Sequence, residues 1–141
     1  MRKTPRSVIA LGILILAVAA CKFSASTANI SALKLGKDKG VGQETSSFSA
    51  NDPVYAVATI SNAPGKVKVK GRLIIEDVPE QKAGPVPGLE QTLDLAGSGT
   101  ATYTFTPPPS GWPAGKYKVE VILMTEEGEQ KDHKDAGFSV S

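Results

Sequence analysis

The sequence predicts an all-β domain, a sandwich of about seven antiparallel strands, behind a short N-terminal export signal. Over residues 66–76, apolar and charged side chains alternate, with Val67 and Val69 on one side and Lys68 and Lys70 on the other. A period of two is typical of a strand with one buried face. Similar segments recur along the chain between turns rich in Gly, Pro, Asn and Asp, and no segment has the period of an amphipathic helix.

Two strands are expected before this alternating segment. Residues 30–35 form the first, and a connection rich in Lys, Gly and Ser follows as far as Ser49. The turn residues 51–53 open a second strand over residues 54–60, and the turn residues 62–65 separate it from the alternating segment.

Four more strands are expected after the alternating segment. They cover residues 89–95, 100–106 and 116–125, and the last one ends at residues 138–141. The breaks between the segments are residues 78–88, 97–99, 107–115 and 126–129, in which Gly, Pro and acidic residues gather. The third break begins with three consecutive prolines, which cannot pair in a central strand and therefore indicate a loop.

The first 20 residues have the composition of a secretory signal peptide. Three basic residues and no acid precede an uncharged, mostly apolar run over residues 7–20. A spanning helix needs about 20 apolar residues, so this shorter run, which stops before Lys22, disfavours a permanent membrane span. An ordinary cleaved signal ending at Ala20 is a second alternative, because small residues precede that position.

Cys21 is the single cysteine of the chain and directly follows Val18-Ala19-Ala20. This tetrapeptide resembles the lipobox of a bacterial lipoprotein signal. The resemblance implies cleavage before Cys21 and attachment of two or three acyl chains, such as palmitate, to that residue. One chain of myristoyl length binds membranes only marginally, whereas two hydrophobic signals anchor stably. The alternative is an unmodified cysteine beside a cleavage site, but an odd cysteine in an exported protein calls for an explanation.

The lipobox resemblance implies that the protein is located in the cell envelope. Residues 22–29 contain three Ser or Thr residues and two alanines, so residues 21–29 are predicted to be the acylated cysteine with a short flexible tether, and residues 30–141 then form one domain. In lipoproteins of the kind that the lipobox resembles, Asp after the acylated cysteine favours retention in the inner membrane. Lys22 departs from that signal, which predicts the outer membrane, facing the periplasm, in a Gram-negative cell.

Charge and cysteine content argue against a basic nucleic-acid-binding protein and against a domain stabilised by internal disulfides. The chain has 16 basic and 14 acidic residues, and loss of the three basic residues of the signal leaves 13 against 14, a net charge of −1. A globally basic nucleic-acid binder is therefore not expected. A single cysteine permits no internal disulfide, so the domain has to be stabilised by its core. About 110 residues is an ordinary length for one such domain.

Tyr117 gives the most specific indication of topology. It lies near the start of an expected strand, two residues before Val119, after the turn Trp112-Pro113-Ala114-Gly115. In immunoglobulin-like sandwiches, a Tyr at this offset forms a tyrosine corner; the alternative is a Tyr that merely begins a strand. Together with residues 52–57, this segment resembles bacterial lipoproteins with immunoglobulin-like or fibronectin type III-like domains. The resemblance implies a Greek-key sandwich, and most such lipoproteins have no assigned activity.

The sequence offers no recognisable catalytic or metal-binding set. His133 is the single histidine and lies in a charged stretch, where a solvated surface residue is expected rather than a catalytic base. Zinc needs several His or Cys ligands. The acidic residues near position 127 lack the ligand spacing of a calcium loop. We therefore expect no enzyme activity, no cofactor, no metal and no small-molecule substrate.

One strand face carries a basic row formed by Lys66, Lys68, Lys70 and Arg72. If residues 116–125 pair beside it, Lys118, Ile122 and Met124 join the same outer face. Such a face could dock an anionic lipid, lipopolysaccharide or an acidic protein. The alternative is that the lysines only deter edge-to-edge aggregation.

The sequence therefore predicts a lipid-anchored, non-enzymatic binding or assembly module of the cell envelope. The loops at residues 79–88 and 107–115 are the candidate contacts with an envelope protein. Trp112 is expected to be an aromatic anchor in the second loop or, alternatively, a plug at the end of the core. The second hypothesis for function is a structural envelope component without a specific ligand, and the third is a binder of anionic surfaces through the basic row.

Overall fold

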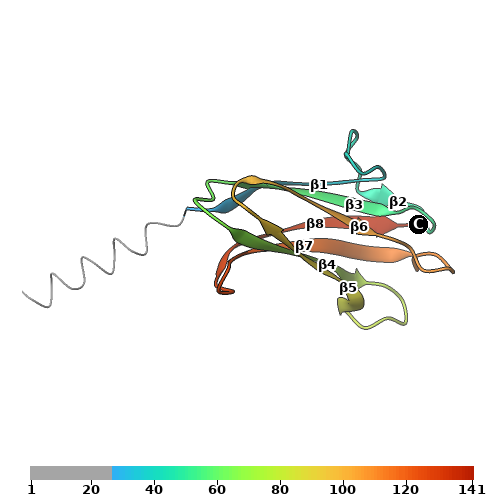
Figure 1. Cartoon of the computed structure of the whole chain (residues 1–141). Helices are drawn as coiled ribbons and strands as arrows, with labels where there is room; N and C mark the ends of the chain where they lie inside the picture. The colour runs from blue at the N-terminus through green and yellow to red at the C-terminus, as the bar shows by residue number, and fades with distance from the viewer. Residues whose placement is uncertain (1–26) are drawn as a thin grey trace, which may run out of the picture.

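The computed structural model describes residues 27–141, which form eight strands and no helix. The strands are β1 (Asn29–Gly36), β2 (Ser47–Phe48), β3 (Val54–Ser61), β4 (Val67–Asp77), β5 (Gly84–Leu95), β6 (Gly99–Phe105), β7 (Gly115–Thr125) and β8 (Gln130–Val140). They make two sheets, ordered β1-β3-β6 and β2-β8-β7-β4-β5, which face each other as a sandwich (Figure 1). The predicted signal peptide, Cys21 and most of the predicted tether lie outside the described residues.

The strand order is that of an immunoglobulin-like sandwich. Strands β1, β3 and β6 occupy the places of strands A, B and E, while β4, β7 and β8 occupy those of C, F and G. All neighbouring strands are antiparallel except β2, which runs parallel to β8. The predicted all-β Greek-key class is confirmed, and so is the predicted pairing of the segments that form β4 and β7.

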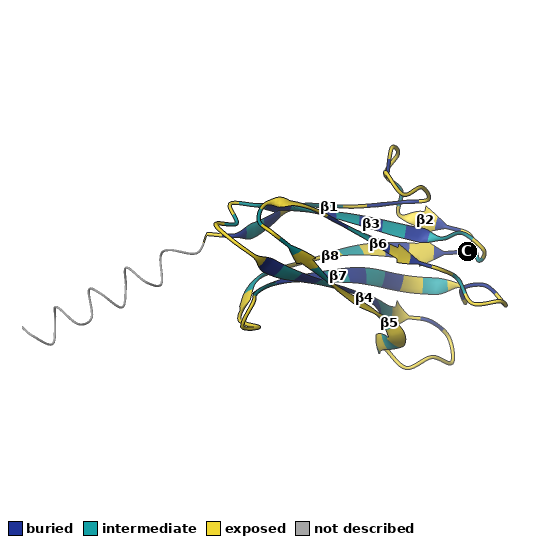
Figure 2. Ribbon diagram, in the orientation of Figure 1, coloured by how far each residue is buried: buried dark blue, intermediate teal, exposed yellow. Residues whose placement is uncertain are grey.

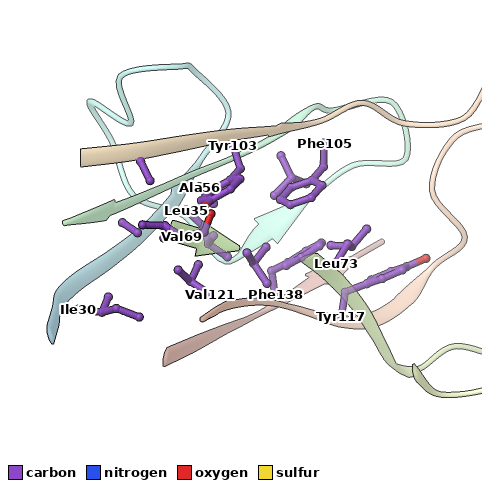
Figure 3. Packing of buried hydrophobic residues seen from close by; sticks show 14 of the residues in the cluster. Ile30, Leu35, Ala56, Val69, Leu73, Tyr103, Phe105, Tyr117, Val121 and Phe138 are labelled. Atoms are coloured by element: carbon purple, nitrogen blue, oxygen red, sulfur yellow. Dashed lines mark hydrogen bonds between the residues drawn. The ribbon is translucent and has the colours of Figure 1, made fainter. Parts of the chain in front are cut away.

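The alternating sequence pattern builds the core. Along β3, β4 and β7, every second residue is buried between the sheets, which Figure 2 shows as dark bands on these strands. The fully buried side chains include Val54, Ile60, Val69, Leu73, Tyr103, Phe105, Val119, Val121 and Leu123. Figure 3 shows Tyr103 and Phe105 of one sheet facing Val69 and Leu73 of the other.

A close approach between the two sheets depends on Gly71. The Tyr103 hydroxyl donates a 2.6 Å hydrogen bond to the carbonyl of Val69, and burial raises the pKa of Tyr103. The ring covers Gly71 so closely that a Cβ there would lie 2.7 Å from Tyr103 Cδ1. The inward position at residue 71 is therefore filled by an aromatic ring from the opposite sheet.

The start of β5, the presence of β2 and the start of β4 differ from the sequence prediction. Strand β5 begins at Gly84 instead of residue 89, because Pro85 and Pro87 lie on an edge strand, where the missing N–H is tolerated. Strand β2 was not predicted, since two residues display no alternation. Lys66 was expected on the alternating strand but precedes β4, which begins at Val67.

The ends of the sandwich carry different loops. The near end contains the start of β1 together with residues 62–66, 96–98 and 126–129. The far end contains residues 37–46, 49–53, 78–83 and 106–114, with Ser141 (Figure 1). No helix in the described part of the chain is long and apolar enough to cross a membrane.

Candidate partner-binding site

An apolar hollow of about 370 Å³ lies at the far end of the sandwich. Ten residues line it, none of them charged: Ile75, Gln81, Val86, Pro87, Leu89, Thr106, Pro108, Trp112, Pro113 and Tyr117. Both segments that the sequence predicted as contact loops contribute, although the second half of the first one forms the start of β5, and the rest of β5 and all of β6 separate them in the chain. The fold therefore brings the two candidate contact loops to one surface, and we call this surface the far-end hollow.

Trp112 forms one wall of the far-end hollow and is itself held by the core. Its side chain is 5% exposed, and its Nε1 donates a 2.8 Å hydrogen bond to the carbonyl of Asp52. Its backbone N–H donates to the carbonyl of Ala50 at 2.7 Å, and its indole contacts the Tyr117 ring edge-on. These contacts are those of a plug at the end of the core that also presents an apolar surface.

Tyr117 holds the loop before β7 through a hydrogen bond to the loop backbone. Its hydroxyl donates a 2.6 Å hydrogen bond to the carbonyl of Pro113, four residues upstream, and burial raises its pKa. Val119, two residues later, points into the core. This is the geometry of a tyrosine corner. The Tyr117 ring also stacks on Phe138 with centroids 5.3 Å apart, and Figure 3 shows the two rings side by side.

Two glycines allow the loop to pass close to its neighbours. Gly111 has a φ of 84° and lies where a Cβ would come within 3.0 Å of the Ala50 carbonyl oxygen. Gly115 has a φ of 152°, and a Cβ there would lie 2.6 Å from the Asp77 carbonyl oxygen. The hydrogen bonds of Trp112 and Tyr117 and the fixed φ of the prolines restrict this loop, which lowers the ordering entropy that binding of a partner would cost.

Asp52 stabilises the corner that receives the Trp112 hydrogen bond. Its carboxylate accepts a 2.8 Å hydrogen bond from the N–H of Ser49 and pairs with Lys37 at 3.2 Å. The Ser49 N–H, and then the Lys37 ammonium, favour the charged form, so the pKa of Asp52 lies below its ordinary value.

The basic row lies on the outer face of the larger sheet, where each strand residue meets a carboxylate. Lys68 lies 3.9 Å from Asp94, Lys70 lies 3.1 Å from Glu90, and Arg72 Nη2 lies 2.6 Å from Glu120. Lys118 on the same face pairs with Asp135 at 3.5 Å. Residues 122 and 124 share this face, as expected. These four cations therefore each have a carboxylate partner, which the sequence could not indicate because cross-strand partners depend on the register.

The remaining candidates lie apart from the far-end hollow. Lys66 is exposed at the near end and lines a depression of about 320 Å³ with Glu126. His133 is exposed on β8, and its backbone N–H donates to the Asp132 carboxylate at 2.8 Å. Within residues 27–141, no three His, Cys, Asp or Glu side chains gather as a group that could hold a metal ion.

Comparisons with known proteins give the fold alone. No family model and no curated protein matches the sequence. A cycloisomaltooligosaccharide glucanotransferase from Paenibacillus is 18% identical over 82% of this chain and 14% of its own, with a TM-score of 0.52. A Niemann-Pick type C2 protein from the Japanese carpenter ant is 12% identical over 83% of this chain and 95% of its own, with a TM-score of 0.50.

A third solved structure, β-glucuronidase 2 from Bacteroides uniformis, is 14% identical over 79% of this chain, with a TM-score of 0.50. The present chain spans 14% of the length of each of the two carbohydrate-active enzymes. The likeness therefore concerns one β-sandwich domain within a much longer chain and carries no enzymatic role to this protein.

Proposed function

We propose that this protein is a lipid-anchored, non-enzymatic module of the bacterial cell envelope that binds a protein partner through the far-end hollow. The observation that carries the proposal is the meeting of the start of β5 and the preceding loop with the proline-bearing loop before β7 around one uncharged surface. Aromatic and aliphatic surfaces of this kind, fixed before binding, are typical centres of protein interfaces.

The start of β1, where the chain enters the sandwich, and the far-end hollow lie at opposite ends of the domain. The chain enters the sandwich at Asn29 at the near end, and Trp112 lies at the far end. A strand of 11 residues such as β7 spans about 35 Å. An acyl anchor on Cys21, which the lipobox resemblance implies, therefore leaves the hollow directed away from the membrane and accessible to an envelope protein.

The chemistry of the hollow supports binding instead of catalysis. Its one titratable lining side chain is Tyr117, whose hydroxyl is engaged by the carbonyl of Pro113 and whose pKa is raised by burial. The single histidine lies on β8, outside the lining. Nucleophilic catalysis needs a base beside the nucleophile, and the lining supplies no such pair.

The basic row is not part of the proposed binding surface. Three of its members are already paired with carboxylates, which lowers the field that would attract an anionic lipid surface. The anionic-surface hypothesis therefore needs those ion pairs to open, whereas the hollow is available as it stands.

An in-cell crosslinking pull-down tests the proposal. The anchored protein should recover one envelope protein in a defined ratio, and Cys21→Ala should recover much less. Pro87→Asp at the exposed rim should abolish recovery, while Thr92→Asp, exposed on the same strand but outside the hollow, should not. Equal recovery with both variants rejects the hollow as the binding site. Recovery of nothing by the anchored protein favours the structural role without a ligand.

A further inference from the structure

A strand edge that is mostly without a neighbouring strand within residues 27–141 lies along β8, away from the far-end hollow. Strand β2 pairs with this edge through two residues only, Ser47 beside Ser139 and Phe48 beside Val140. Before Ser139, the outer edge of β8 has no neighbouring strand in the described part of the chain. Figure 1 shows β2 as a short arrow beside the end of β8.

The backbone polarity of this edge follows from the register. Ser139 N–H donates to Ser46 O at 2.8 Å and Ser141 N–H to Phe48 O at 3.1 Å, both away from β7. Pairing with β7 continues without a shift back to Asp132. Backbone groups alternate in direction along a strand, so the N–H and C=O groups of Asp135 and Gly137 also point outward.

Both ends of this free stretch are closed by the protein itself. At one end, the Asp132 carboxylate accepts hydrogen bonds of 2.8 Å from the N–H groups of Ile30 and His133. At the other end, Ser46 already accepts from Ser139. Between them, no hydrogen bond from outside β7 reaches the amides of Asp135 or Gly137 within residues 27–141.

A groove of about 520 Å³ runs beside this stretch. It is lined by Leu33 and Leu35 of β1, by Ala136 and Gly137 of β8, by residues 44–46 of the connection and by Ser47 of β2. The half-buried Leu33 and the buried Leu35 form its apolar side. Gly137 is exposed, and a glycine inside a strand often marks a place where another backbone approaches closely.

The chain's own connection does not fill this groove. Residues 37–46, which could have extended β2, form a compact loop in which Val41 N–H and Gly42 N–H donate to the carbonyl and carboxylate of Asp38. Val41 packs so closely on Gly36 that a Cβ there would lie 2.9 Å from Val41 Cγ1. Within residues 27–141, this connection therefore covers β8 only through the two residues of β2.

We propose that His133–Gly137 binds an extended segment of a partner protein, which pairs with β8 in continuation of β2 and places an apolar side chain against Leu33 and Leu35. Strand addition gives affinity through main-chain hydrogen bonds and specificity through alternate side chains. A second copy of this chain fits less well, because antiparallel pairing of two such edges about their centre sets Asp135 opposite Asp135.

Hydrogen exchange of the full chain tests the free edge first. Without a ligand, the amides of Asp135 and Gly137 should exchange much faster than those of Lys134 and Ala136, whose groups point to β7. Equal protection of all four amides in a monomer means that the edge is already covered, and equal protection in a dimer means that a second copy covers it. Either result overturns the proposal.

The binding step is tested with acetylated hexapeptides in which Val alternates with Thr, Lys or Glu. At about ten times the Kd of the best peptide, exchange at Asp135 and Gly137 should slow about tenfold. The same peptide N-methylated on alternate residues, which cannot donate from one edge, should lose this effect, and so should Gly137→Pro, which removes one outward N–H. Thermal unfolding checks that this variant folds, and the N-methyl arm does not depend on it.

Three results contradict strand addition at β8. They are the absence of protection with every peptide, equal protection by the N-methylated peptide, and protection confined to β5, the edge strand on the opposite side of the same sheet.

Discussion

The Trp112 indole nitrogen donates a 2.8 Å hydrogen bond to the backbone carbonyl of Asp52, sixty residues earlier in the chain. This bond joins the loop before β7 to the turn before β3 and so connects the two sheets at the far end. The same indole is a wall of the far-end hollow. Stability and binding are therefore coupled at this residue, and variants have to be chosen so that the two effects separate.

Substitution of Trp112 should destabilise the domain strongly. Trp112→Ala removes a large buried side chain and should lower the free energy of unfolding by about 3–5 kcal/mol. Trp112→Phe keeps most of the apolar volume but leaves the Asp52 carbonyl without its donor, and should cost about 1–3 kcal/mol. Urea unfolding measures both values. A change near zero for Trp112→Ala would mean that the side chain is not part of the core.

Tyr117→Phe isolates the hydrogen bond of the tyrosine corner. The ring and its stacking on Phe138 are retained, while the bond from the hydroxyl to Pro113 is lost, so the free energy of unfolding should fall by about 1 kcal/mol. Tyr55→Phe on β3 is the matched control and should change stability little. Equal urea midpoints for both variants would contradict a structural role for the Tyr117 hydroxyl.

Gly71→Ala should overpack the interface between the sheets. The added methyl group would lie 2.7 Å from Tyr103, whose hydroxyl holds the ring against Val69. Overpacking of this kind costs about 1–3 kcal/mol. Gly99→Ala, where nothing lies within 4 Å of the added Cβ, is the control and should be close to neutral. Chemical denaturation of the pair measures the difference, and a neutral Gly71→Ala would contradict the packing described.

The stability that Asp52 contributes should depend on pH. Its pKa is depressed in the folded state below the ordinary 3.8, so its contribution is present above that value and is lost as the pH falls through the folded pKa. The difference in unfolding free energy between the natural protein and Asp52→Asn should therefore be constant near neutrality and shrink in acid. Urea titrations at about pH 6 and about pH 3 measure it. If the difference in unfolding free energy grew in acid, the pKa of Asp52 in the folded protein would be raised and not depressed.

Much of the fold could be predicted from local pattern. Alternation at residues 66–76 predicted the buried face of β4. The offset from Tyr117 to Val119 favoured an immunoglobulin-like sandwich, and if β4 and β7 are strands C and F of that fold, they are neighbours, as the structure has them. The two-residue strand β2 was not predicted because it is too short for any period to appear. The early start of β5 was not predicted because proline is disfavoured in strands except at an edge, and Pro85 and Pro87 therefore suggested a loop. Whether a strand lies at an edge depends on the whole sheet.

The candidate site was predictable in its parts and not in its assembly. Both loops and Trp112 were singled out by composition, but only the folded chain brings Pro87 and Pro108 to one hollow. The basic row illustrates the opposite case. Its alternation is visible in the sequence, whereas the pairing of Lys70 with Glu90 and of Arg72 with Glu120 depends on cross-strand register.

The central claim is that the far end of the anchored domain contacts a protein partner. Its most direct test is a photoreactive amino acid placed in living cells at Gln81, on the rim of the hollow, and in parallel at Glu127, exposed at the near end. We predict one discrete crosslinked protein from position 81, lost with Pro87→Asp, and none from position 127. Crosslinks of equal yield from both positions, or the same product after Pro87→Asp, would contradict the account.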